Sequence, residues 1–354
     1  MAILVVPIPF APFGWPRFAR HDIDRHFPGS GPVSRPHPSN RNAENADMLK
    51  IAIIGAGRVG ESTAQFLAES DLAREIALLD VREGAAAGAA LDIQETAPLF
   101  GFDARLVGDT DPAVIAGAEL VIVTAGLPRK PGMSRSDVLD KNVEILDSIL
   151  VDVMREAPDS RLLVVSNPVD VLTYRAWQKT GWERSRVFGQ AGVLDASRMA
   201  AFIALETGLS TRDIHTLVLG GHGDSMVPML RYSGINGIPL HHFMDQDAID
   251  RIVERTRHGG AEILALKQTS SAYDAPAAAI KAMVEAIVLD RQRVLPTVAL
   301  LNGEYGASDI AMGVPCVLGA GGMERIVELE LNAAEREAFT TSLAGVKADI
   351  DRLQ

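Results

Sequence analysis

The sequence of 354 residues contains a single cysteine, few aromatic residues and no long uninterrupted apolar run. Because Cys316 has no partner within the chain, we expect neither an internal disulfide nor a multi-cysteine metal site, and we expect a reducing, cytoplasmic location. Aromatic residues make up 5% of the chain against 31 glycines, which indicates an aliphatic core with close backbone contacts. A membrane-spanning helix needs about 18–20 consecutive apolar residues, so we expect no membrane partner.

Positive charge is also scarce, since 34 Lys and Arg face 46 Asp and Glu and give a net charge of −12. This balance argues against nucleic acid as a partner, although a few local arginines can still bind a small anion. The eight histidines show no spacing typical of a metal site, and the pair His241 and His242 is interpreted as a surface turn. We therefore expect no catalytic metal.

Prolines are concentrated in residues 1–47, which contain eight of the chain's 19. Prolines at this density interrupt both helices and strands, so we expect an irregular extension. The segment lacks the basic start of a signal peptide, and acidic residues oppose a transit peptide. Met48 stands directly before an apolar run, which favours Met48 as the true translation start.

Residues 48–191 alternate short apolar runs with helical patterns. Continuous apolar runs of strand length, typical of strands buried on both faces, occupy 49–55, 75–80, 119–126 and 161–168. Helical patterns separate them at 59–69, 85–96 and 137–156. This alternation predicts a doubly wound parallel sheet, the Rossmann form of an α/β domain.

Residues 192–354 have a different pattern, which predicts an α+β domain. Long helical patterns occupy 196–207, 246–268 and 276–289, with short strand-like segments between them. A final helix is expected after Asn332, because Glu335 completes a capping box and apolar residues then recur at helical spacing.

The first chemical motif is a glycine-rich turn between the first strand and the first helix. It consists of Gly55, Ala56, Gly57, Arg58, Val59 and Gly60. The glycines permit a tight turn, close approach of a pyrophosphate and close packing of helix on strand. Asp80 ends the second strand, where a carboxylate binds ribose hydroxyls and repels a 2′-phosphate. The motif therefore predicts a dinucleotide site that prefers NAD to NADP.

Three further features follow along the chain. Arg129, Lys130 and Arg135 lie in a loop after the fourth strand, which suits either a cover over an anion or a solvated basic loop. His222 stands between two glycines; we interpret these as room for substrate rather than packing, which favours proton transfer over a structural histidine. Asp195 and Arg198 share one helix face, as in an active site or an ordinary ion pair.

Together these motifs resemble the lactate/malate dehydrogenase family. IIGAGRVG, LLD, TAGLPRKPGMSR, SNPVD, GVLDASR and GGHGDSMVP occur in the family's order, from about Met48 to the C-terminus. The resemblance implies an NAD-dependent enzyme of the tricarboxylic acid cycle that forms a homodimer or homotetramer. Ser225 and Asp170 depart from frequent family residues, but both keep hydrogen-bonding capacity.

The resemblance also assigns roles to single residues. His222 matches the proton-transferring histidine, Asp195 the carboxylate that orients it, and Arg135 the arginine that polarises the reacting oxygen. The matching substrate-binding residues are Arg129, Arg135, Asn167, Arg198 and His222. Cofactor contacts beyond the glycine turn and Asp80 fall on Thr124, Ala125, Gly126, Asn142, Val165 and Asn167.

Arg129 indicates which substrate the enzyme takes. Malate and oxaloacetate carry a second carboxylate that needs a cationic partner in a closed site, whereas the lactate-specific pattern has an uncharged Gln at this position. We therefore expect reversible oxidation of malate to oxaloacetate. The alternatives are a lactate-type dehydrogenase, a NAD- and metal-dependent glycosidase, and a non-catalytic NAD-binding sensor.

Overall fold

The computed structural model describes residues 49–127 and 135–353, and of residues 135–137 it describes the backbone alone. The proline-rich extension 1–47 lies outside these ranges, so its irregular structure stays a prediction.

A sheet of nine strands runs through the described residues, in the order β14-β13-β12-β6-β5-β4-β1-β2-β3. Six of its strands are the parallel strands β1 (Lys50–Ile54), β2 (Glu75–Leu79), β3 (Arg105–Asp109), β4 (Leu120–Val123), β5 (Arg161–Val164) and β6 (Val187–Gly189). Read from β3 to β6, their order is 3-2-1-4-5-6, which is the doubly wound arrangement. The predicted α/β Rossmann fold is therefore confirmed.

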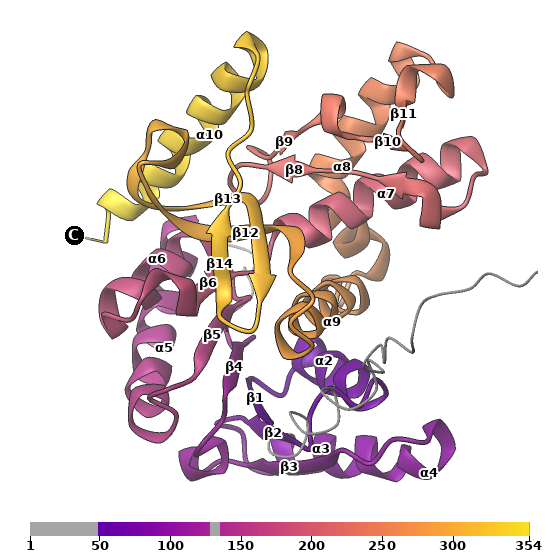
Figure 1. Ribbon diagram of the computed structural model, residues 1–354. Helices are drawn as coiled ribbons and strands as arrows, with labels where there is room; N and C mark the ends of the chain where they lie inside the picture. The colour runs from indigo at the N-terminus through magenta and orange to yellow at the C-terminus, as the bar shows by residue number, and fades with distance from the viewer. Residues whose placement is uncertain (1–48, 128–134, 354) are drawn as a thin grey trace, which may run out of the picture. The chain divides into compact units, whose positions relative to one another are not determined.

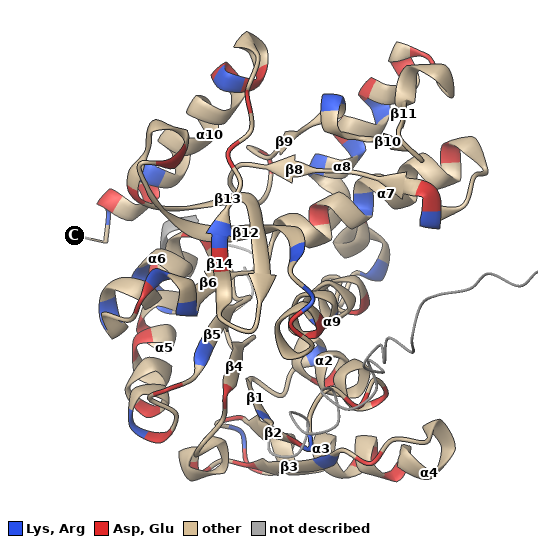
Figure 2. Ribbon diagram, in the orientation of Figure 1, with Lys and Arg blue, Asp and Glu red and all other residues tan. Residues whose placement is uncertain are grey.

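Helices cover both faces of the parallel strands, because these strands are apolar on both faces. The helices of this half are α2 (Arg58–Ala68), α3 (Ala85–Glu95), α4 (Ala97–Phe100), α5 (Arg135–Glu156) and α6 (Val169–Thr180). Figure 1 shows α5 and α6 on one side of the strands, and α2 on the other side together with α9 (Asp274–Val288). The charged residues lie mainly on the outer helices and loops, with both signs interspersed (Figure 2).

The second half of the chain extends the same sheet with three antiparallel strands. These are β12 (Arg293–Asn302), β13 (Ser308–Gly319) and β14 (Gly322–Ile326), and β12 joins β6 where Val298 pairs with Gly189. The sequence indicated only short strand-like segments here, yet β12 spans 10 residues and β13 spans 12. Most of their side chains are buried, so the polar alternation that marks a strand in a sequence is missing.

A smaller core holds the remaining elements. Helices α7 (Gly192–Thr207) and α8 (Gln246–Lys267) pack through buried Met199, Ile203 and Ile252. Short antiparallel pairs accompany them: β7 (Ile214–His215) with β10 (Gly234–Ile235), β10 with β11 (Ile238–Pro239), and β8 (Val218–Leu219) with β9 (Val227–Pro228). The boundary that we predict between 191 and 192 falls between β6 and α7.

The final helix, α10 (Ala333–Asp351), begins as predicted. The Asn332 side chain accepts a hydrogen bond from the Glu335 N–H, and the Glu335 carboxylate accepts one from the Asn332 N–H, each at 2.9 Å. Phe339, Val346 and Ile350 are buried and fix one face of the helix on the body. The predicted capping box and apolar face are confirmed.

Candidate active site

The glycine-rich turn joins β1 to α2 and is compact by necessity. Gly55 has a φ of +109°, and a Cβ on it would lie 2.6 Å from the Ala125 backbone nitrogen. A Cβ on Gly60 would collide with the Gly55 carbonyl oxygen. The Thr124 hydroxyl donates a hydrogen bond to that same carbonyl at 2.9 Å. A larger residue at Gly55 would collide with the segment after β4, and one at Gly60 would push α2 away from the turn.

The start of α2 has the properties of a phosphate-binding site. Gly57 is the N-cap residue, and no described side chain caps the helix there. Apart from the adjoining backbone, no described atom lies within 4 Å of the place that a Cβ on Gly57 would take, so there is open space for a ligand beside it. The first N–H groups of a helix lack intrahelical partners, and its dipole favours an anion. Arg58 is exposed and Val59 is half-buried at the same end. These features fit the pyrophosphate of a dinucleotide.

Asp80 lies beside this turn, directly after β2. Its Oδ2 accepts a hydrogen bond from the Ala56 N–H at 2.8 Å, and its side chain is 10% exposed. Burial raises the pKa of Asp80, but hydrogen bonds from Arg82 and Ala56 outweigh burial and lower the pKa below its ordinary value. The sequence interpretation missed Arg82, although a cation two residues after a strand-ending acid is a visible signal. The carboxylate is therefore ionised, as an acceptor of ribose hydroxyls has to be.

The remaining predicted cofactor residues lie at the carboxyl ends of β4 and β5. Thr124, Ala125 and Val165 are half-buried there, and Gly126 is exposed. Asn142 of α5 is buried: its amide donates to the Asn167 carbonyl at 2.7 Å and accepts from the Leu127 N–H at 2.7 Å. The Asn142 amide thus joins the loop after β4 to the loop after β5.

His222 and Asp195 are 27 residues apart in sequence and in direct contact in space. Nδ1 of His222 lies 2.9 Å from Oδ2 of Asp195, whose side chain is 2% exposed. Asp195 belongs to the first turn of α7, and His222 follows β8 in the loop 220–225. Since a carboxylate accepts, Nδ1 carries the hydrogen, and Nε2 is left as the nitrogen that exchanges a proton.

The surroundings of His222 favour its protonated form. Burial lowers the pKa of His222, but the charge and hydrogen bond of Asp195, together with the charge of Asp170, outweigh burial and raise it above the ordinary value. The imidazole can therefore hold a proton near neutral pH and release it to a bound substrate.

A second carboxyl group, Asp170 of α6, holds the backbone of His222. Its Oδ2 accepts a hydrogen bond from the His222 N–H at 2.9 Å, while its Oδ1 is buried without a hydrogen-bond partner among the described residues. Burial raises the pKa of Asp170 to about 6. The sequence interpretation noticed Asp170 only as a departure from a family pattern, and a lone acid gives no signal of this contact.

The glycines around His222 correct the sequence interpretation in part. Gly221 donates its N–H to the Ser342 hydroxyl of α10 at 2.9 Å, and a Cβ on Gly221 would lie 2.8 Å from Val346 Cγ2. Gly221 is therefore needed for packing against the final helix, and the interpretation as room for substrate is wrong for it. Gly223 has a φ of +113° and open space around its Cβ position.

Arg198 lies one helical turn after Asp195 on α7. Its Nη1 donates to Oδ1 of Asp195 at 3.2 Å, and its buried Nε has no hydrogen-bond partner among the described residues. Arg198 runs along Gly259 of α8, where a Cβ would lie 3.2 Å from Arg198 Cδ. A glycine pair inside a helix lowers helix propensity, and that signal could have pointed to a side chain passing here.

The other predicted substrate residues are placed only in part. Asn167 is exposed at the carboxyl end of β5, on the same edge of the sheet as the glycine turn. Arg135 begins α5, but its side chain is not among those described, and Arg129 lies outside the described residues. The structure thus brings His222, Asp195 and Arg198 together and leaves the loop arginines as predictions.

Comparison with known proteins decides the family. Residues 49–189 match the model described as "lactate/malate dehydrogenase, NAD binding domain", and residues 192–354 match "lactate/malate dehydrogenase, alpha/beta C-terminal domain". The chain belongs to the lactate/malate dehydrogenase family. The predictions of this family and of a Rossmann domain that binds NAD are confirmed.

Individual relatives agree with the family models. This lactate/malate dehydrogenase family member is 75% identical over 307 residues to a malate dehydrogenase of Thioalkalivibrio sulfidiphilus, which covers 87% of this chain and 100% of the relative. It is 62% identical over 304 residues to one of Nitrosococcus oceani, covering 86% and 98%. The solved structure of malate dehydrogenase from Salinibacter ruber matches with a TM-score of 0.83 and 43% identity, covering 86% of this chain and 98% of that chain.

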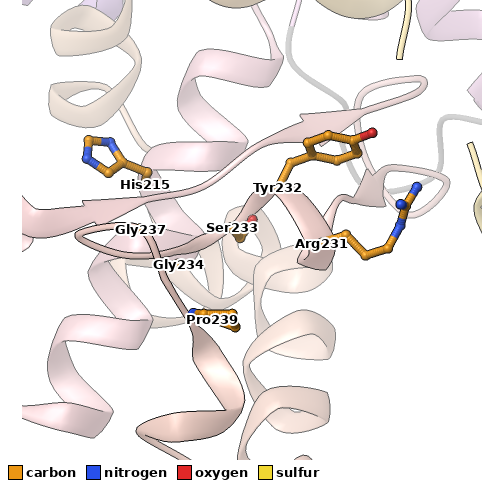
Figure 3. A pocket seen from close by; sticks show the side chains of 7 residues that line it. All are labelled: His215, Arg231, Tyr232, Ser233, Gly234, Gly237 and Pro239. Atoms are coloured by element: carbon orange, nitrogen blue, oxygen red, sulfur yellow. The ribbon is translucent and has the colours of Figure 1, made fainter. Parts of the chain in front are cut away.

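Other features of this family member lie apart from the site. A cavity of about 240 Å³ is lined in part by His215, Arg231 and Tyr232 (Figure 3), but Arg231 is already bound by Glu335 at 2.6 Å. Cys316 is buried on β13, and burial raises the pKa of its thiol, as expected for a structural residue. The described residues contain no group of three metal-ligating side chains and no helix apolar and long enough for a membrane.

Proposed function

We propose that the chain is an NAD-dependent malate dehydrogenase, which oxidises malate to oxaloacetate reversibly. The observation that carries the proposal is the buried Asp195 carboxylate, whose two oxygens contact His222 at 2.9 Å and Arg198 at 3.2 Å. One carboxylate thereby orients a proton carrier and a carboxylate-binding group toward the same substrate. The relatives named above as malate dehydrogenases support the choice of substrate.

In this proposal NAD, when bound, supplies the hydride chemistry by accepting a hydride from C2 of malate. Neutral His222 removes the C2 hydroxyl proton at Nε2, and Asp195 stabilises the imidazolium that results. In the reverse direction, protonated His222 donates to the C2 oxygen of oxaloacetate. A protein group is thus ready to move the proton in both directions.

Arginines bind the two ends of the substrate. Arg198 holds the C1 carboxylate, for which a planar guanidinium offers two parallel hydrogen bonds. Arg135 polarises the C2 oxygen, Arg129 pairs with the second carboxylate, and Asn167 hydrogen-bonds the substrate, as the resemblance implies. A thousandfold preference for oxaloacetate over pyruvate needs about 4 kcal/mol of differential binding, a magnitude that an unpaired buried charge can supply.

The cofactor site is proposed at the carboxyl edge of the parallel strands. The turn of residues 55–60 holds the pyrophosphate and Asp80 the adenosine ribose, on the evidence of the open Gly57 backbone and the ionised carboxylate. In this proposal the cofactor extends toward Asn167 along Thr124, Ala125, Gly126 and Val165. Asn142 holds the loops that carry these residues through its hydrogen bonds to Leu127 and Asn167. Ligands of open α/β sheets bind at this edge.

The domain bounds, the cellular location and the oligomeric state are also part of this proposal. We place an extension at 1–47, a cofactor domain at 48–191 and a substrate domain at 192–354. The ranges of the two family models, 49–189 and 192–354, support the second and third of these. We further propose a cytoplasmic homodimer or homotetramer in the tricarboxylic acid cycle, since closed symmetry is the common form of soluble oligomers. Size-exclusion chromatography with light scattering measures the oligomeric state.

One assay tests the reaction. NADH oxidation is followed with oxaloacetate, with pyruvate and without substrate, and we expect the highest kcat/KM for oxaloacetate. Faster turnover of pyruvate would contradict the malate assignment, and no turnover of either would contradict the enzyme. Arg129→Gln should then shift the preference toward pyruvate; an unchanged ratio would place specificity elsewhere.

A further inference from the structure

The carboxylate of Asp80 is covered by the guanidinium of Arg82. Its Oδ1 accepts from the Arg82 N–H at 2.9 Å and from Arg82 Nε at 3.1 Å. Its Oδ2 accepts from the Ala56 N–H at 2.8 Å and from Arg82 Nη2 at 3.2 Å, and Nη2 also donates to the Ala56 carbonyl at 2.9 Å. A carboxylate offers about four acceptor positions, so this one is fully occupied by protein donors.

Two of these four hydrogen bonds come from backbone N–H groups, and the other two come from a side chain that a ligand can displace. The N–H groups of Ala56 and Arg82 belong to the backbone and fix the carboxylate in place. The guanidinium is on a side chain that is 64% exposed, so it can move into solvent when another donor takes its place at Asp80. A ribose diol that binds Asp80 therefore has to displace the Arg82 side chain and leaves the backbone bonds intact.

The displaced guanidinium stays close to the ribose, because Arg82 follows Asp80 by only two residues. A 2′-phosphate, in contrast to a diol, donates no hydrogen bond to Asp80 and need not displace the guanidinium. Arg82 can then keep its bonds to Asp80, which offset the charge of the carboxylate, and meet the phosphate with its remaining N–H groups, since a planar guanidinium offers five. The sequence argument for NAD over NADP treated Asp80 as an uncompensated charge, and the structure shows that it is compensated.

We propose that Arg82 lets this ribose site accept a 2′-phosphate, so that the chain uses NADP(H) as a weaker second cofactor. The inference rests on the proposed function, which places the adenosine ribose at Asp80. NAD remains preferred for two reasons. Asp80 accepts hydrogen bonds from a ribose that carries no phosphate, and the negative charge of Glu61 on α2, which acts on Arg82, disfavours a phosphate there. Arg82 is thus a specificity-determining residue for the cofactor.

Binding of nucleotide fragments tests the proposal without turnover. Titration calorimetry compares adenosine 2′,5′-bisphosphate with 5′-AMP on the wild type, on Arg82→Ala and on a control, Arg105→Ala. Arg105 is a matched control, since it is 72% exposed and pairs with Glu75 at 3.3 Å at the opposite end of the strands. We expect Arg82→Ala to weaken the bisphosphate at least tenfold and to leave 5′-AMP unchanged or bound more tightly.

Kinetics with oxaloacetate complete the test. The wild type should oxidise NADPH with a lower kcat/KM than NADH, and Arg82→Ala should lower the NADPH value at least tenfold through KM. Arg105→Ala should leave both values unchanged. Equal losses for both fragments, an unchanged ratio of NADPH to NADH activity, or a wild type inert with NADPH would overturn the inference. If the wild type reduces oxaloacetate with NADH, any of these three results overturns the inference about Arg82 and leaves the proposed function standing.

Discussion

The two halves of the candidate site are built in different ways. The nucleotide half consists of backbone groups from residues 55–60 and the neighbouring Asp80, and it lies at an open edge of the sheet. What we propose as the proton-transfer half consists of the side chains of His222, Asp195 and Asp170, which come from different elements and are largely buried. Burial strengthens each electrostatic contact, so changes in the second half should have the larger effects.

The largest expected effect separates the halves directly. Asp195→Asn keeps the shape of the side chain but no longer favours hydrogen on Nδ1 of His222 and no longer offsets the imidazolium charge. We expect kcat to fall roughly a thousandfold, in line with similar changes in His–carboxylate pairs. NADH affinity, measured by fluorescence titration, should stay within about twofold, because the nucleotide half is separate.

A matched control for Asp195→Asn is Asp147→Asn, which breaks the bond between Asp147 and Arg175 at 2.6 Å on the outer helices α5 and α6. Its kcat should stay near the wild-type value. Loss of NADH affinity in Asp195→Asn would show that the two halves are not independent.

The pH dependence sharpens the description of the buried half. Because Asp195 and Asp170 raise the pKa of His222, the imidazole stays protonated to a pH above its ordinary value of about 6.5. Oxaloacetate reduction needs this proton, so its kcat/KM should fall about tenfold for each pH unit above the pKa of His222. Malate oxidation should rise over the same range. Parallel profiles in the two directions would remove His222 as the proton carrier.

Asp170 allows a stability test of the same half. Folding raises the pKa of Asp170 to about 6, so the folded state binds this proton more tightly and the group weakens stability as the pH rises from about 4 to about 6. Asp170→Asn cannot ionise. Its free energy of unfolding relative to wild type should therefore improve by on the order of 2–3 kcal/mol between pH 4 and pH 7. Urea unfolding at both pH values measures this, and a constant difference would contradict the assignment.

Substitutions at the neighbouring glycines Gly259 and Gly260 of α8 should have a smaller effect on kinetics, and Gly260→Ala is the control for Gly259→Ala. Gly259→Ala places a Cβ 3.2 Å from Arg198 Cδ, whereas Gly260→Ala places one 3.8 Å from Nη2, an ordinary contact. Both changes raise helix propensity by up to about 1 kcal/mol. We expect Gly259→Ala to raise the KM for oxaloacetate about tenfold and Gly260→Ala to leave it unchanged. Equal KM values would show that Arg198 adapts to the added methyl group.

The smallest effect lies outside both halves. Glu335 accepts from the Asn332 N–H at 2.9 Å and from Arg231 Nη2 at 2.6 Å. Glu335→Gln weakens the capping box and the exposed ion pair, so we expect a loss of about 1 kcal/mol in thermal denaturation. Kinetics should not change, because the start of α10 touches neither half; a change in KM would extend the site to this helix.

The sequence by itself determined the features that depend on neighbouring residues. The glycine turn, the strand-ending Asp80, the capping box at Asn332 and the alternation of strands and helices are short-range patterns, and the structure shows each of them. Strands β12 and β13 were underestimated because burial on both faces removes their alternation. Arg82 was visible in the sequence, but its position over Asp80 depends on side-chain geometry.

Only the tertiary structure decided how the proton-transfer half is assembled. No local pattern brings Asp195 to His222 across 27 residues, or Asp170 and Ser342 to the backbone of His222 and Gly221. These contacts form because the packing of α6, α7 and α10 on one sheet places their buried polar groups beside each other, where each needs a partner. The sequence therefore identifies His222 and Asp195 as candidates, whereas the packing of the core sets the distances between them.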